Sequence, residues 1–286
     1  MQPTNPLIKQ AWLRVLLFVV AYITFLIFSA TITALVLSAV FNGKANENLP
    51  DFYIYILLNF IAGFFMVWLF RRLVDRKSFK SLGWQWKGFA REGIAGFTTG
   101  IFLCCVIAVV LWLMQLLQWF TDDINIAALA SSFVLMMLVA LVEELVFRGY
   151  ILGNLMETVS KEAALLMSAF IFAAAHSLNP EFNLTAFLNI LLAGLLLGIN
   201  FIYTRNLWFG IFLHFTWNYL QGPLLGFKVS GLELPSLLQQ NLNGSVLLTG
   251  GEFGLEASWL AVIAFLLALP VFYLLFQKKY QQLPPE

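Results

Sequence analysis

Long apolar runs, almost free of charged residues, are the feature of this sequence that most limits how it can fold. Hydrophobic residues make up 61% of the 286 positions and charged residues only 11%, whereas a soluble domain carries about 25% charged residues. The runs reach the length of about 20 residues that a helix needs to cross the hydrocarbon core of a bilayer. They are continuous rather than alternating, so helices are expected and strands are not. We therefore predict an all-α polytopic membrane protein.

Eight transmembrane helices are expected. They cover residues 12–41, 52–70, 93–120, 127–157, 161–178, 184–203, 207–222 and 257–276. These helices divide the chain into three parts. Residues 1–126 hold the first three helices, residues 127–222 hold helices four to seven, and residues 223–286 hold an external loop and the eighth helix. The connection 223–256 is rich in Gly and Pro, which predicts an irregular external loop or a short re-entrant piece.

The distribution of charge predicts the orientation in the membrane. Segment 71–92 holds seven of the sixteen Lys and Arg residues, and basic residues collect in cytoplasmic connections. Both termini should then be cytoplasmic. We expect an integral protein of the cell (plasma) membrane. The opposite connections carry the acidic residues Asp122, Asp123, Glu181, Glu233, Glu252 and Glu256.

The basic segment 71–92 also contains Trp84 and Trp86, so it lies either along the membrane interface or in water as a linker. A net charge of +1 gives no indication of nucleic-acid binding, and we expect none. Cys104 and Cys105 are adjacent within an apolar run, which is typical of packing residues rather than of a disulfide.

A few ionisable and amide residues stand in the apolar runs, where each costs several kcal/mol unless it is paired, hydrated or useful. They lie in the fourth, fifth and seventh predicted helices. The set is Glu143, Glu144, Arg148, His176, His214 and Asn218. The two histidines are the only ones in the chain, which favours one shared polar pocket.

Helical spacing predicts how these residues cooperate. Glu144 and Arg148 are four apart and share a face, whereas Glu143 is rotated by about 100° and points elsewhere. If the fourth helix continues to about Glu157, Glu143 lies at the depth of His176. We then expect its carboxylate within about 7 Å of both imidazoles, close enough for one water or metal to bridge them.

Two chemistries fit such a pocket. A carboxylate beside imidazoles can deprotonate a water that attacks a carbonyl, while an imidazole and an amide stabilise the oxyanion. Alternatively, Glu143, His176 and His214 are a plausible ligand set for zinc, which would lower the pKa of the water. The HExxH zinc signature is absent, so the spacing leaves metal use open.

At these residues the sequence resembles the CPBP family, the CAAX protease and bacteriocin-processing membrane proteins, also called the abortive-infection family. Three motifs carry the resemblance over about residues 127–222. They are EExxxR at Glu143, Glu144 and Arg148, FxxxH at Phe172 and His176, and HxxxN at His214 and Asn218.

The resemblance implies an eight-helix intramembrane endopeptidase whose pocket opens toward the cytoplasm and the bilayer, with a membrane-associated peptide or protein as substrate. It makes Glu143 the general base and has His176 hold the same water. His214 and Asn218 would form the oxyanion hole, with Glu144 and Arg148 as the supporting pair. The family is described both as metallopeptidase-like and as glutamic, so zinc stays open, and nothing in the sequence indicates a prenylated substrate.

Two other functions remain to be distinguished from proteolysis. A non-proteolytic scaffold or bacteriocin self-immunity protein would use the motifs for packing only. A proton-coupled transporter would use Glu, Arg and His as a relay, but the other helices have few charges and no inverted repeat is evident.

Overall fold

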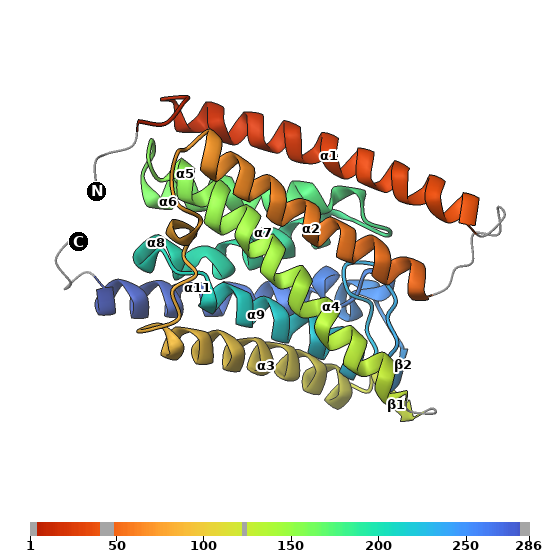
Figure 1. Ribbon diagram of the computed structural model, residues 1–286. Coiled ribbons are helices and arrows are strands. Elements are labelled where there is room, and N and C mark those ends of the chain that lie inside the picture. The colour runs from red at the N-terminus through yellow and green to blue at the C-terminus, as the bar shows by residue number, and fades with distance from the viewer. Residues whose placement is uncertain (1–4, 41–48, 122–124, 281–286) are drawn as a thin grey trace.

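The computed structural model describes residues 5–40, 49–121 and 125–280, and its long helices form a bundle (Figure 1). The long helices are α1 (Ala11–Val40), α2 (Leu49–Leu73), α3 (Ala90–Leu113), α4 (Ile126–Glu144), α6 (Lys161–Ala175), α7 (Leu184–Ile199), α9 (Trp208–Tyr219) and α11 (Trp259–Tyr280). The short elements are α5 (Gly153–Leu155), α8 (Phe201–Thr204), α10 (Val246–Thr249), β1 (Leu117–Thr121) and β2 (Leu238–Leu242). The acidic pair Asp122 and Asp123 lies outside the described residues.

The all-α polytopic class predicted from the sequence is confirmed. Within the described residues, 6 helical segments are long and apolar enough to cross a membrane. They are Ala11–Ile32, Ala90–Leu113, Ile126–Leu155, Lys161–Leu178, Leu184–Thr204 and Trp259–Tyr280. The predicted eight helices are all present as helical segments, of which α2 and α9 are not among these candidate spans.

The fourth predicted helix continues past Glu143 and Glu144, which is what places Glu143 at the depth of His176. A π-helical stretch, Leu145–Leu152, joins α4 to α5 without a break, so the helical segment reaches Leu155. A π-helical stretch shifts the positions that follow it around the helix axis and is frequent at functional sites. Arg148 stands within it and is 1% exposed.

Small residues set the approach of neighbouring helices. A Cβ on Gly198 of α7 would come within 2.5 Å of Leu165 on α6, and one on Gly194 within 3.0 Å of Ala169. These two glycines form the GxxxG step of the sixth predicted helix, which permits close helix contact. Gly100 likewise permits close contact between α3 and α9, because a Cβ there would lie 2.0 Å from Thr216 Oγ1.

The third predicted helix, 93–120, is too long in the prediction. Helix α3 ends at Leu113, and Gln115 then adopts a left-handed conformation with φ of 60°. The chain continues as β1, which pairs antiparallel with β2 from Leu117 opposite Leu242 to Thr121 opposite Leu238. The prediction missed these strands because each needs a partner more than a hundred residues away, and β2 lies in the segment expected to be irregular.

The basic segment 71–92 packs against the helices, so it is more than a linker in water or a segment along the membrane interface. It folds across one end of the bundle and makes hydrogen bonds to the start of the seventh helix. Leu207 N donates to Gly83 O at 3.0 Å, and Trp208 Nε1 donates to Trp84 O at 3.3 Å. Trp86 remains 46% exposed.

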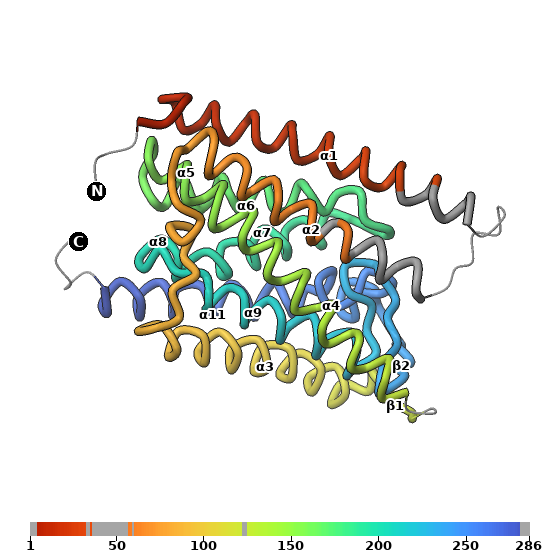
Figure 2. The backbone as a smooth tube through the Cα atoms, viewed as in Figure 1, coloured from red at the N-terminus to blue at the C-terminus, as the bar shows by residue number. Residues whose placement is uncertain are grey.

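The first turn of α1 and the last turn of α11 lie at the same end of the bundle, together with segment 74–89 (Figures 1 and 2). Segment 225–258, which contains β2 and α10, lies at the other end (Figure 1). This arrangement agrees with two termini on one side of a membrane, and the cytoplasmic assignment of that side stays a prediction.

Candidate active site

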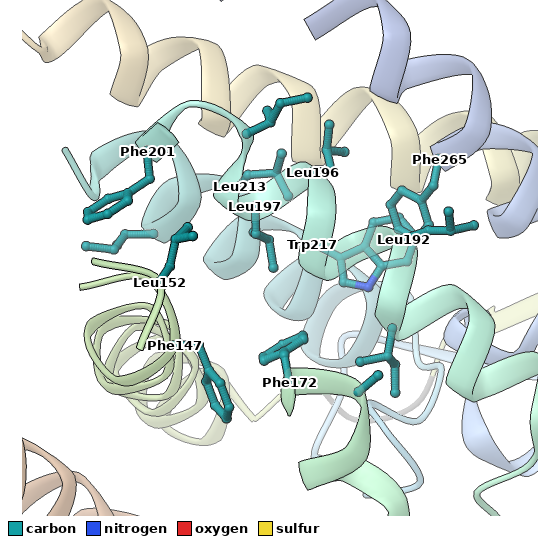
Figure 3. Packing of buried hydrophobic residues seen from close by; sticks show 14 of the residues in the cluster. Phe147, Leu152, Phe172, Leu192, Leu196, Leu197, Phe201, Leu213, Trp217 and Phe265 are labelled. Atoms are coloured by element: carbon teal, nitrogen blue, oxygen red, sulfur yellow. The ribbon is translucent and has the colours of Figure 1, made fainter. Parts of the chain in front are cut away.

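A cavity of about 350 Å³ lies among α4, α6, α7 and α9. Apolar side chains make most of its wall, and Figure 3 shows several of them, including Phe147, Phe172, Leu197 and Trp217. The polar residues of the wall are Glu143, His176, Asn179, Asn189, His214, Asn218, Ser230 and Glu256. Polar groups that converge in a largely apolar pocket mark the default candidate for an active site.

Glu143 faces both histidines, within the distance expected from the sequence. Its Oε2 atom lies 3.9 Å from His176 Nε2 and 3.8 Å from His214 Nε2. Within the described residues this oxygen is buried and has no hydrogen-bond partner. The three atoms are too far apart to bond directly but close enough for one small molecule to contact all of them.

Glu144 has a different set of contacts, as its position on the helix predicts. Its Oε1 atom accepts a hydrogen bond from Arg148 at 2.8 Å and lies 3.1 Å from His214 Nδ1. The side chain is fully buried. Arg148 also donates to Gly194 O at 3.0 Å, and its guanidinium stacks 4.4 Å above the Phe172 ring.

These contacts assign the protons on both imidazoles. His176 Nδ1 lies 2.8 Å from Phe172 O, and a carbonyl only accepts, so Nδ1 carries the hydrogen. His214 Nδ1 faces the carboxylate that pairs with Arg148, which also only accepts. In both rings Nε2 then faces Glu143 Oε2. A water between these atoms can donate to the carboxylate and bond to a ring nitrogen, which would satisfy the buried oxygen.

Asn218 lies one helical turn after His214 on α9, lines the cavity and is 5% exposed. No hydrogen bond joins its side-chain amide to another of the described residues, and the residue belongs to the cavity wall. The six residues predicted from the sequence thus lie in or directly behind one cavity. Their catalytic roles stay predictions.

The zinc interpretation uses the same three side chains as the water interpretation and stays open. Glu143, His176 and His214 have the donor atoms that zinc prefers. In the described part of the chain, however, the structure contains no group of three or more His, Cys, Asp or Glu side chains that is arranged to hold a metal ion. No step proposed below passes through a metal.

Sequence reasoning missed part of the polar wall. Asn189 stands in the apolar run of α7, where an amide is itself a signal, and it is fully buried. Ser230 and Glu256 come from segment 225–258, in which Glu256 had been counted only as an external acidic residue. The signal for these two was absent, because only the fold brings that segment to the cavity.

The cavity among the apolar helices thus combines a carboxylate that faces two imidazoles with a nearby side-chain amide. Residues 125–220 match the family model described as Rce1-like, type II CAAX prenyl endopeptidase Rce1-like. All three motifs lie inside the matched range, and the match confirms the resemblance to the CPBP family of membrane proteases. Comparisons with curated proteins and with solved structures gave no match.

Proposed function

We propose that this protein is an intramembrane endopeptidase that hydrolyses a peptide bond of a membrane-associated peptide or protein. One observation carries the proposal: Glu143 Oε2 lies 3.8 and 3.9 Å from the Nε2 atoms of two imidazoles whose Nδ1 atoms are held elsewhere. The match of residues 125–220 to a family of CAAX prenyl endopeptidases supports the same reaction.

Glu143 acts as the general base in this proposal. Its Oε2 takes a proton from a water that His176 Nε2 helps to orient, and the water oxygen bonds to the scissile carbonyl carbon. The proton then passes from Glu143 to the leaving amide nitrogen as the C–N bond breaks. The products are a carboxylic acid and an amine, so no other reactant is needed.

His214 and Asn218 stabilise the oxyanion. Asn218 offers its amide N–H, and His214 donates from Nε2 in its doubly protonated form. The carboxylate of Glu144 at His214 Nδ1 favours that form, because a negative charge close to the ring stabilises the imidazolium. Arg148 pairs with Glu144 at 2.8 Å and holds it in place. Glu144 and Arg148 are therefore positioning residues.

The test compares purified wild type with Glu143→Gln and His176→Ala in a fluorogenic peptide-library assay. We expect each variant to lose at least about 100-fold in kcat/KM, since removal of a general base costs about 10² to 10⁴. The matched control is Glu162→Gln, an exposed glutamate at the start of α6 whose side chain is 51% exposed, and it should keep full activity.

Further arms separate the alternatives. Wild-type-like cleavage by Glu143→Gln would overturn the mechanism. A wild type that cleaves no peptide, prenylated or not, while Glu143→Gln keeps the biological phenotype would favour a scaffold or immunity protein. Activity that 1,10-phenanthroline abolishes and zinc restores would overturn the metal-free reaction.

A further inference from the structure

A second polar wall of the cavity lies outside the three motifs. Glu256 stands on the short turn Leu255–Ala257 and Asn189 on α7, and both line the cavity. The turn packs against α7, and Asn189 Nδ2 donates to Ser258 O at 2.8 Å. The two side chains therefore belong to one wall, built by α7 and segment 225–258.

Each side chain keeps an acceptor oxygen that the protein does not use. Glu256 Oε2 accepts from Ser230 N at 2.6 Å and from Ser230 Oγ at 2.8 Å, while no donor among the described residues engages Oε1. Asn189 is fully buried and its Oδ1 has no partner within the described residues. A buried acceptor without a donor is destabilising, so a ligand that donates to Asn189 Oδ1 is favoured.

The charge of the cavity indicates which ligand. Its wall holds the carboxylates of Glu143 and Glu256, and among the described lining residues there is no Lys or Arg. Burial raises the pKa of Glu256, although the bonds from Ser230 and the nearby rings of His176 and His214 act in the opposite direction. The protein alone therefore leaves this anion incompletely stabilised, and a cation would complete it.

We propose that Glu256 and Asn189 form a subsite for the cationic group of a Lys or Arg side chain of the substrate peptide. The ammonium or guanidinium group donates to Glu256 Oε1 and Asn189 Oδ1 while the backbone of the peptide reaches Glu143. The subsite rests on the proposed endopeptidase function and adds a substrate class to it. Glu256 lies outside residues 125–220, so this selectivity belongs to a segment beyond the matched family range.

A purely structural role for Glu256 makes a different prediction. Its carboxylate caps the turn at Ser230 and Gly231, whose φ angles are 49° and 83°. Glu256→Gln keeps an acceptor oxygen for Ser230 and removes only the charge, so it separates binding of a cation from support of the turn. Glu252→Gln is the matched control, because it removes the same charge from the same segment at a side chain that is 70% exposed.

The experiment uses pairs of fluorogenic peptides that carry Lys or its neutral analogue acetyl-lysine at successive positions around the scissile bond. We expect wild type to prefer the Lys peptide by at least about tenfold in kcat/KM at one position, as a buried charge pair allows. Glu256→Gln should bring that ratio close to one, and Glu252→Gln should leave it unchanged. Binding of both peptides to Glu143→Gln, with and without Glu256→Gln, is measured in parallel by fluorescence anisotropy.

The outcomes distinguish the subsite from the reaction. Cleavage by wild type with no preference for Lys at any position overturns the subsite and leaves the proposed function standing, and this arm needs no variant to fold. Absence of cleavage, together with Lys-selective binding that Glu256→Gln removes, supports the subsite and overturns the function. An equal loss of selectivity in Glu252→Gln also overturns the subsite, because the effect would then be a general one of charge.

Discussion

Glu144 and Glu143 are adjacent residues with separate surroundings, and the fully buried one is the one whose charge is neutralised. Glu144 lies between Arg148 and His214, whereas the Glu143 side chain is 26% exposed and faces the cavity. A buried ion pair adds little stability by itself, but loss of one partner leaves an uncompensated charge. The pair is therefore better understood as a device that fixes His214 than as a source of stability.

A second cluster of charges, which the sequence did not reveal, joins α1 to the end of α2. Arg14 donates to Asp75 at 3.0 Å, and Arg71 donates to the same carboxylate at 2.9 Å. Asp75 is fully buried and Arg14 is 1% exposed. Glu157 joins the cluster through Arg14 and Lys77. The charge distribution in the sequence gives Arg71 a role only in orientation, but both Arg14 and Arg71 are structural.

The acid side of this cluster makes stability depend on pH. Burial raises the pKa of Glu157, but hydrogen bonds and charges from Lys77 and Arg14 outweigh it and hold the pKa below the ordinary value. A lowered folded-state pKa contributes stability above the unfolded pKa, and that stability is lost as pH falls through the folded pKa. We expect Glu157→Gln to unfold at a lower temperature than wild type near neutral pH, and the two curves to converge in acid.

Thermal unfolding in detergent between about pH 7 and about pH 3 measures this convergence. Lys77→Met serves as the companion variant, because it removes one of the two cations that pair with Glu157. It should also lower the unfolding temperature near neutral pH, and this difference from wild type should shrink in acid. A gap between wild type and Glu157→Gln that stays constant over the whole range would contradict the assignment.

At the scale of elements, one glycine on α9 decides how closely that helix approaches the buried carboxylate of Glu144. A Cβ on Gly210 of α9 would lie 2.5 Å from Glu144 Oε2 and 2.9 Å from Leu197 O. No larger residue fits without moving Glu144 or separating α9 from α7. The position of the Glu144 carboxylate thus depends on a glycine that lies far along the chain, at position 210.

We expect Gly210→Ala to lower kcat/KM by at least about tenfold, because a catalytic group misplaced by about 1 Å can cost 100-fold. Gly153→Ala on α5 is the matched control: its nearest neighbour would be 3.7 Å away, an ordinary contact, and Ala favours the helix. Peptide hydrolysis and the thermal midpoint are measured for both. Full activity in Gly210→Ala would show that Glu144 does not need its present position.

For the whole molecule, the orientation in the membrane and the opening of the cavity are linked. Segment 225–258 lines the cavity from the end of the bundle opposite to the first turn of α1 and the last turn of α11 (Figure 1). If both termini are cytoplasmic, as the basic residues predict, this wall faces the external side, whereas the family resemblance implies a pocket open to the cytoplasm. The two expectations therefore lead to opposite orientations.

Cysteine labelling decides between them. In a background with Cys104 and Cys105 replaced by Ala, single cysteines are placed at two exposed positions, Lys80 and Asn243. Lys80 belongs to segment 74–89 and Asn243 directly follows β2, and these segments lie at opposite ends of the bundle (Figure 1). The charge distribution predicts that an impermeant maleimide labels Asn243→Cys on intact cells and Lys80→Cys only after permeabilisation. The reverse pattern would overturn the cytoplasmic termini and place the wall formed by segment 225–258 in the cytoplasm.

The helical fold and the principal polar residues were readable from the sequence because lipid imposes strong local rules. A run of about 20 apolar residues must form a helix in a bilayer, and an ionisable residue within such a run stands out. Glu143, His176 and His214 were found on this basis. The continuation of the fourth helix followed from the need to bring Glu143 level with His176.

The remainder depended on contacts between distant segments, for which a single sequence carries no local rule. The pairing of β1 with β2, the burial of Arg14 against Asp75 and the position of Gly210 beside Glu144 are all of this kind. The sequence by itself determined that the chain forms membrane helices bearing an acid, two imidazoles and an amide, because hydrophobicity and spacing act along the chain. Only the tertiary structure decided that Glu256 joins their cavity, because packing alone brings segment 225–258 against α7.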